Sequence, residues 1–182
     1  MRPKVVGLLE DNFNFLTKMC TTRMRQAAFE MIAAAKSAGA RVVVNGSDAI
    51  DQTAAYLHVG ADAVILGEAE ETFLDVTDRW SDDPDADLSQ VPGLAITGPA
   101  ATRSSIRRTP ARHAIKDLDA LPFPAWDLVP YRQYDGTELM RGIRPFVTVL
   151  TSRGCPFSCG YCPYPVAQGR KLRVRSPANV VD

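Results

Sequence analysis

The sequence predicts an α/β fold with a parallel sheet, mainly because strand-like and helix-like segments alternate along it. Three short apolar runs, at residues 4–9, 41–45 and 62–66, are each followed by a segment in which apolar residues recur at helical spacing. Strands that alternate with helices in this way pair in parallel through right-handed crossovers. Short runs without polar alternation are typical of strands that are buried on both faces. We therefore expect a buried parallel sheet.

The segments between these runs carry the start and stop signals of helices. The first begins at the capping candidates Thr21 and Thr22 and stops before Gly39. The second covers residues 51–58, and the third opens at residues 67–72 with acidic side chains, which favour a helix N-terminus. Three strand–helix units follow from this pattern.

The turn after the second strand, which contains Gly46 and Ser47, is a candidate ligand site. Ligands of open α/β sheets bind beyond the carboxyl ends of the strands. A glycine there lets the backbone approach a ligand, and the following helix N-terminus offers amide donors. The residues alone are equally consistent with an ordinary strand-to-helix turn, so both interpretations stay open.

The middle of the chain has the composition of a linker. Residues 81–87 form an acidic, proline-containing break, and residues 91–97 and 102–109 have the pattern of a small hairpin. A proline-rich stretch follows, in which regular helix is disfavoured. We expect its two large aromatic residues, Phe123 and Trp126, to anchor it against a domain surface.

A short loop near the C-terminal end contains Cys155, Cys159 and Cys162, with the spacing C-x3-C-x2-C. Three thiolates can bind three irons of a four-iron cluster and leave the fourth iron open for another ligand. A zinc site normally takes four protein ligands, and the spare candidates, His113 and Cys20, are distant in sequence. From spacing, an iron–sulfur site, a zinc site and incidental thiols remain open.

The composition excludes several classes of protein. Lys and Arg number 21 and Asp and Glu also number 21, so the chain lacks the basic excess of a general nucleic-acid binder. No apolar run has the length of a membrane span, and the N-terminal residues do not have the pattern of a signal peptide. We expect a reducing, cytoplasmic setting, which suits free thiols.

The cysteine loop, with Tyr161 directly before the third cysteine, resembles the cluster-binding signature of radical S-adenosylmethionine enzymes. Three earlier stretches, residues 42–46, 63–70 and 117–127, resemble the cobalamin-binding members of that family. The similarity runs in the same order over nearly the whole chain. Where the family usually has a Gly-Gly pair, this chain has Asn45-Gly46.

The resemblance implies a division of the chain into three parts. Residues 1–80 would form part of a flavodoxin-like, cobalamin-binding domain with three βα units. Residues 81–142 would be a linker with the small hairpin. Residues 143–182 would be the first strand and the cluster loop of a (β/α) radical barrel. Because only 20 residues follow Cys162, we expect the chain to be a fragment.

The resemblance also implies an activity. The cluster would be a 4Fe–4S cluster, S-adenosylmethionine would bind its open iron, and reductive cleavage would give a 5′-deoxyadenosyl radical for methyl transfer or rearrangement of a small-molecule substrate. A flavodoxin or ferredoxin would donate the electron. The alternative is a non-catalytic nucleotide- or cobalamin-binding module with a structural zinc. The implied ligands are Cys155, Cys159 and Cys162 for the cluster, Tyr161 for S-adenosylmethionine, and Gly46, Ser47, Gly67 and Glu68 for cobalamin.

Overall fold

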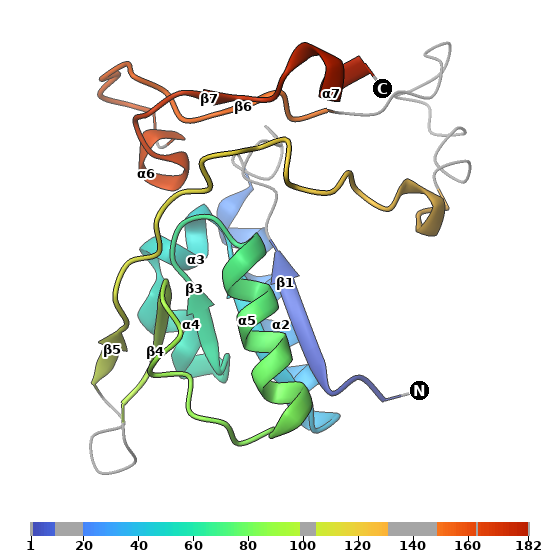
Figure 1. The fold of residues 1–182 in the computed structure, drawn as a ribbon. Helices are drawn as coiled ribbons and strands as arrows, with labels where there is room; N and C mark the ends of the chain where they lie inside the picture. The colour runs from blue at the N-terminus through green and yellow to red at the C-terminus, as the bar shows by residue number, and fades with distance from the viewer. Residues whose placement is uncertain (1, 10–19, 99–104, 131–148, 163, 182) are drawn as a thin grey trace, which may run out of the picture.

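The computed structural model describes residues 2–9, 20–98, 105–130, 149–162 and 164–181. Its main body is a five-stranded sheet in the order β1-β2-β3-β4-β5, with helices on both faces (Figure 1). The strands are β1 (Val5–Leu9), β2 (Arg41–Asn45), β3 (Ala63–Ile65), β4 (Leu94–Thr97) and β5 (Ile106–Arg108). The helices of this body are α2 (Thr21–Ser37), α3 (Ser47–Asp51), α4 (Thr53–Val59) and α5 (Glu70–Asp82).

The strands β1, β2 and β3 pair in parallel, which confirms the predicted sheet. Their side chains alternate between two buried clusters, one on each face. Val42, Val44 and Val64 pack with α2, α3 and α4, whereas Val43 and Ile65 pack with α5. These strand residues are at most 2% exposed. Burial on both faces explains why the strands are continuously apolar instead of alternating with polar residues.

The predicted hairpin is present as β4 and β5, but it belongs to the sheet. β4 pairs antiparallel with β3, with Ile65 opposite Leu94, and β5 pairs antiparallel with β4. Leu88 and Val91 also pack into the cluster beneath α5. The sheet and its core therefore continue beyond residue 80, where we expected the first domain to end.

Two helix boundaries differ from the sequence prediction. α2 begins at Thr21, so the residue before it is Cys20, which makes no side-chain capping bond. The second helical segment begins at Ser47 and not at Asp51, and Gln52 divides it into α3 and α4. The turn after β2 therefore leads into helix without an intervening loop.

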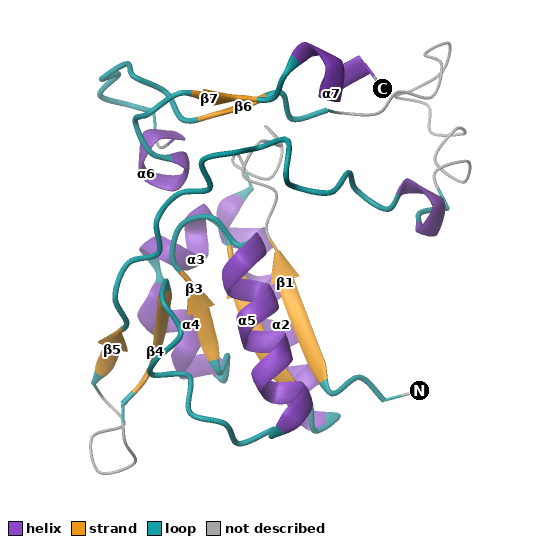
Figure 2. Ribbon diagram, viewed as in Figure 1, coloured by secondary structure: helices purple, strands orange, loops and turns teal. Residues whose placement is uncertain are grey.

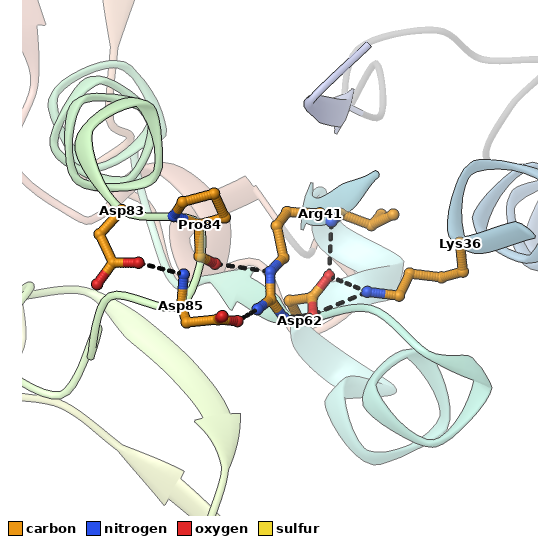
Figure 3. A network of polar contacts seen from close by, with 7 residues as sticks. Lys36, Arg41, Asp62, Asp83, Pro84 and Asp85 are labelled. Carbon is orange, nitrogen blue, oxygen red and sulfur yellow. Dashed lines mark hydrogen bonds and ion pairs between the residues drawn. The ribbon is translucent and has the colours of Figure 1, made fainter. Parts of the chain in front are cut away.

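A group of ion pairs lies at the amino edge of the sheet (Figure 3). Asp62, at the start of β3, accepts hydrogen bonds from Lys36 at 2.7 and 2.9 Å, from Arg41 at 3.0 Å and from the backbone N–H of Val42 at 2.7 Å. Arg41 also pairs with the exposed Asp85. These contacts join the end of α2 and the segment after α5 to the sheet.

The C-terminal part consists of short elements joined by loops (Figure 2). β6 (Ser152–Arg153) pairs antiparallel with β7 (Arg173–Val174), and the helices α6 (Tyr164–Gln168) and α7 (Pro177–Val181) are one turn or a little more. Ser176 caps α7, because its Oγ accepts a hydrogen bond from the backbone N–H of Asn179 at 3.1 Å. The predicted strand at residues 145–150 falls mostly outside the described residues.

The proline-rich stretch is held differently from our expectation. Phe123 and Trp126 are 48% and 38% exposed, so they do not anchor it. Leu118 and Ile115 are buried instead. The guanidinium of Arg175 lies 5.2 Å from the centre of the Phe123 ring, a cation–π contact. No described helix has both the length and the apolar character that crossing a bilayer requires.

A buried carboxylate joins α2, α3 and α4. Asp48 accepts from Arg25 Nε at 2.7 Å and from Tyr56 Oη at 2.9 Å. Burial raises the pKa of Asp48, but the hydrogen bonds from Arg25 and Tyr56 outweigh it, so the pKa lies below its ordinary value. The carboxylate is therefore charged at neutral pH, and the hydrogen bonds from Arg25 and Tyr56 offset the cost of burying that charge.

We predict that Tyr56→Phe lowers the free energy of unfolding by about 1.5 kcal/mol, because Asp48 loses one buried hydrogen bond. The ring contact with Phe29, whose centroid lies 5.1 Å away, is kept. Urea denaturation at neutral pH measures the change. Tyr161→Phe removes the same hydroxyl from a side chain that is 91% exposed, and it should leave stability unchanged. Equal stability of the two variants would contradict the prediction.

Candidate functional site

The carboxyl edge of the parallel strands brings the two predicted cofactor turns together. Residues 46–47 follow β2, and residues 67–68 follow β3. The side-chain amide of Asn45 donates to the carbonyl oxygens of Ile65 and Gly67, each at 3.1 Å. Asn45 therefore connects the two turns, a function that a glycine in its place could not supply. No local pattern indicated this bridge, since the carbonyl groups that accept from Asn45 are about 20 residues away.

Both turns depend on glycine backbone conformations. Gly46 has φ of 153° and Gly67 has φ of 90°, which residues with a Cβ rarely adopt. A Cβ added at Gly67 would meet no atom within 4 Å. The surface beside Gly67 is therefore open, and the backbone there can be approached closely by a ligand.

We call the part of the chain from β6 to β7, which contains the three cysteines, the cysteine segment. It lies above this edge of the sheet (Figure 1). Its thiols are free, with Cys159 exposed and Cys155 and Cys162 partly exposed. The backbone N–H of Cys155 donates to the carbonyl oxygen of Gly169 at 3.1 Å. Gly154 has φ of 85°, and a Cβ added there would lie 2.1 Å from a backbone oxygen of Lys171. A glycine is thus required directly before the first cysteine.

The donor set of this segment fits an iron–sulfur cluster. It offers three unpaired thiols on one short turn, and thiolates are the ligands of such clusters. Among the described residues, no three His, Cys, Asp or Glu side chains are grouped to hold a single metal ion. A four-iron cluster does not need such a group, because each thiolate binds a different iron.

Two buried charges connect the cysteine segment to the sheet. Arg173, on β7, donates from Nη1 to Glu68 Oε2 at 2.9 Å and to the carbonyl oxygen of Ile115 at 2.6 Å. Its Nη2 donates to the carbonyl oxygen of Gln168 at 3.1 Å. Glu68 Oε2 also accepts from the backbone N–H of Ile115 at 2.8 Å. Both side chains are only 7% exposed.

A second arginine of the cysteine segment adds to this connection. Arg153, on β6, pairs with Glu70 and lies 3.8 Å from Glu68. Burial raises the pKa of Glu70, but the hydrogen bond from Arg153 outweighs it and leaves the pKa lowered. Burial lowers the pKa of Arg153, and the bond to Glu70 reverses this and raises it. Both groups are therefore charged at neutral pH.

Sequence reasoning placed Glu68 at the cofactor edge but missed its partners. One signal was available, namely that arginines flank the cysteines on both sides while three acidic residues lie at the start of α5. The side chain of Tyr161 is 91% exposed to solvent. Its predicted contact with S-adenosylmethionine stays a prediction, as do the cofactor functions of the other site residues.

A pocket of about 140 Å³ lies where the sheet edge meets the cysteine segment. It is lined by Gly67, Glu68, Glu71, Arg112, His113, Ala114, Ile115, Gln168 and Gly169. A larger groove of about 830 Å³ lies at the opposite, amino edge, beside Asp62, and contains none of the predicted site residues. The pocket at the carboxyl edge is therefore the one that belongs to the candidate site.

We predict that Arg173→Gln releases the cysteine segment from the sheet. Leaving Glu68 buried without its partner costs about 3 kcal/mol, which corresponds to a roughly hundredfold larger open population. Hydrogen exchange at the backbone amides of Ile115 and Arg175 should rise by about that factor. Arg107→Gln, on the exposed strand β5, is the matched control. Unchanged exchange in Arg173→Gln would show that the ion pair does not hold the segment.

The Glu70–Arg153 pair predicts a pH dependence of the same docking. Because the pKa of Glu70 is lowered in the folded chain, its stabilising contribution is complete above the unfolded value, about 4.3, and is lost as the pH falls through the folded value. The protection factors of the segment, which correct for the pH dependence of intrinsic exchange, should therefore be constant from pH 7 to 5 and fall below about pH 4. In Glu70→Gln this part of the acid dependence should disappear.

Comparison with known proteins gives relatives of one kind. No family model matches the chain. It is 33% identical over 121 residues to an uncharacterised methyltransferase of Pyrococcus horikoshii, covering 66% of this chain and 24% of that protein. It is 32% identical over 122 residues to the anaerobic magnesium-protoporphyrin IX monomethyl ester cyclase of Cereibacter sphaeroides, covering 66% and 18%. The chain thus spans about a quarter or less of these relatives.

Solved structures with the same fold include the radical S-adenosylmethionine methyltransferase TsrM from Kitasatospora setae, determined with cobalamin and a 4Fe–4S cluster bound. Its TM-score is 0.71 at 20% identity, over 100% of this chain and 35% of TsrM. The cobalamin-dependent S-adenosylmethionine radical enzyme OxsB, with aqua-cobalamin bound, matches with a TM-score of 0.64 at 19% identity, over 98% and 22%. The predicted resemblance is thereby confirmed. About a third of the aligned residues are identical to those of curated methyltransferases, and the chain has the fold of the cobalamin-dependent radical S-adenosylmethionine methyltransferases, to which it is similar.

Proposed function

We propose that this chain holds a 4Fe–4S cluster and a cobalamin side by side and contributes both to a radical S-adenosylmethionine methyltransferase. The observation that carries the proposal is the buried pair of Glu68 and Arg173. It joins the glycine turns at the carboxyl edge of the sheet to the strand that follows the cysteines. This contact supports the proposal that the two expected cofactor sites are neighbours.

In this proposal the cysteine segment binds the cluster through Cys155, Cys159 and Cys162. Bound S-adenosylmethionine and cobalamin would supply radical cleavage and methyl-group transfer. The chain's own contribution is to hold three thiolates on a turn of fixed shape, since Gly154 and the bond from Cys155 to Gly169 determine how the turn leaves β6. Tyr161 would contact S-adenosylmethionine through its backbone.

The turns after β2 and β3 would line the cobalamin. Gly67 allows close approach of the backbone, Gly46 supplies the positive φ of a buried turn, and Ser47 opens the helix α3 directly at this edge. Both carboxylate oxygens of Glu68 are engaged, Oε1 in the ion pair with Arg173 and Oε2 by Arg173 and the backbone N–H of Ile115. Its function toward a cofactor would therefore be mainly to position the turn. Methyl transfer is favoured over rearrangement, because the curated relatives include methyltransferases.

In this proposal the end of the first domain is set by the extent of the sheet, which includes the hairpin, and not by the acidic break at residues 81–87. Residues 1–80 and the hairpin would form the cobalamin side, the proline-rich stretch would cross to the second part, and residues 143–182 would carry the cluster. A small-molecule substrate and an electron donor such as a flavodoxin or ferredoxin are part of the same proposal, as is a cytoplasmic location.

Anaerobic reconstitution with iron and sulfide tests the cluster. We expect about four irons per chain and a broad visible absorption near that of 4Fe–4S proteins, because three thiolates suffice to hold the cluster. Cys159→Ala should lose both signals. Cys20→Ala is the matched control, since Cys20 is also an exposed free cysteine but lies outside the segment.

The same experiment separates the alternative. Stoichiometric zinc in place of iron, held by the same cysteines, would favour a non-catalytic binding module with a structural metal. Loss of iron in Cys20→Ala as well as in Cys159→Ala would contradict the assignment of the three loop cysteines.

A further inference from the structure

The residues directly after α6 contact the first half of the cysteine turn. Arg170, whose side chain is exposed, donates from Nη1 to Ser158 Oγ at 3.0 Å and to the carbonyl oxygen of Phe157 at 3.4 Å. The residue before it, Gly169, accepts from the backbone N–H of Cys155 at 3.1 Å. Two consecutive residues therefore bind the beginning and the middle of the turn that leads to the second cysteine.

The cysteine segment carries only positive side-chain charges. Residues 152–174 contain no Asp or Glu, and their cations are Arg153, Arg170, Lys171 and Arg173. The two arginines on β6 and β7 pair with Glu68 and Glu70. Arg170 has no carboxylate partner among the described residues. Its charge is thus not neutralised by that part of the chain, although it lies beside the cysteines.

A positive charge at this place has a physical consequence for an iron–sulfur cluster. A 4Fe–4S cluster held by three thiolates is negative overall, and one-electron reduction adds another negative charge. A nearby cation stabilises the more negative state, and solvent keeps this effect modest for an exposed side chain. The potential of such clusters is set in part by net charge and by hydrogen bonding around the ligands. The Arg170 guanidinium contacts Ser158, directly before Cys159, so it can affect both.

We infer that Arg170 is a positioning residue for the cluster, which orders the turn between the first two cysteines and favours the reduced state. The inference rests on the proposed function, in which the loop cysteines hold a 4Fe–4S cluster. Arg170 then has two separable effects. Its hydrogen bonds to Ser158 and Phe157 fix the turn, and its charge acts on the reduction equilibrium.

A redox titration of the reconstituted full chain tests the effect of the charge. Dithionite supplies the electron, and the visible absorption of the cluster reports its reduction without substrate or protein partner. We expect Arg170→Gln to lower the equilibrium constant for one-electron reduction about threefold, which corresponds to a midpoint potential about 30 mV more negative. Arg170→Lys keeps the positive charge and should keep a potential close to that of the wild-type chain.

The rate of iron loss to a chelator tests the ordering of the turn. In Arg170→Gln the oxidised cluster should lose iron roughly fivefold faster, because the turn loses its hydrogen bonds to the guanidinium. Ser158→Ala removes the accepting hydroxyl and no charge, so it should speed iron loss and leave the midpoint potential unchanged. Lys171→Gln removes the neighbouring exposed cation, whose side chain donates no hydrogen bond within the described residues, and should leave iron loss unchanged.

Wild-type potential and wild-type iron loss in Arg170→Gln would overturn the inference, and so would equal changes of both quantities in Lys171→Gln. The cluster itself would stand in either case. Should Arg170→Gln take up no iron, Arg170→Lys decides instead, since restored uptake supports the effect of the charge and failed uptake overturns it. Absence of iron uptake by the wild-type chain would overturn the proposed cluster function together with this inference.

Discussion

The buried ion pair of Glu68 and Arg173 is the interaction on which the candidate site depends. Its two residues are 105 positions apart in sequence, and each is 7% exposed. Removing two charges from water is costly, and attraction between them offsets the cost only when further hydrogen bonds complete the geometry. Here the backbone of Ile115 supplies both a donor for the carboxylate and an acceptor for the guanidinium. Three segments of the chain therefore meet at one pair of side chains.

The two edges of the sheet have different characters. At the amino edge, Asp62 is surrounded by Lys36, Arg41 and a backbone amide, and these contacts leave no buried polar atom of that group without a partner among the described residues. At the carboxyl edge, the turn at Gly67 and the buried carboxylate of Glu68 lie beside a pocket.

The sequence was sufficient for features that depend on neighbours in the chain. The three parallel strands and the end of α2 before Gly39 follow from local composition, and the cysteine spacing with Tyr161 identified the kind of relative. The pairing of β4 with β3, the bridge made by Asn45 and the contacts of Arg153 and Arg173 could not be predicted. Each of these joins residues that are distant in sequence, and their local patterns are compatible with several partners.

The order of the strands in the sheet has a consequence for folding. β1 to β5 lie side by side in the same order in which they occur along the chain. Each strand can therefore add to the edge formed by the strand before it, although helix-containing crossovers must close between β1, β2 and β3. The cysteine segment follows the sheet in the chain, so its arginines meet Glu68 and Glu70 at the end of a sheet whose strands have already been synthesised. The cysteines would thus take up their final positions only after the sheet has formed. Iron would then bind to a turn that is already ordered.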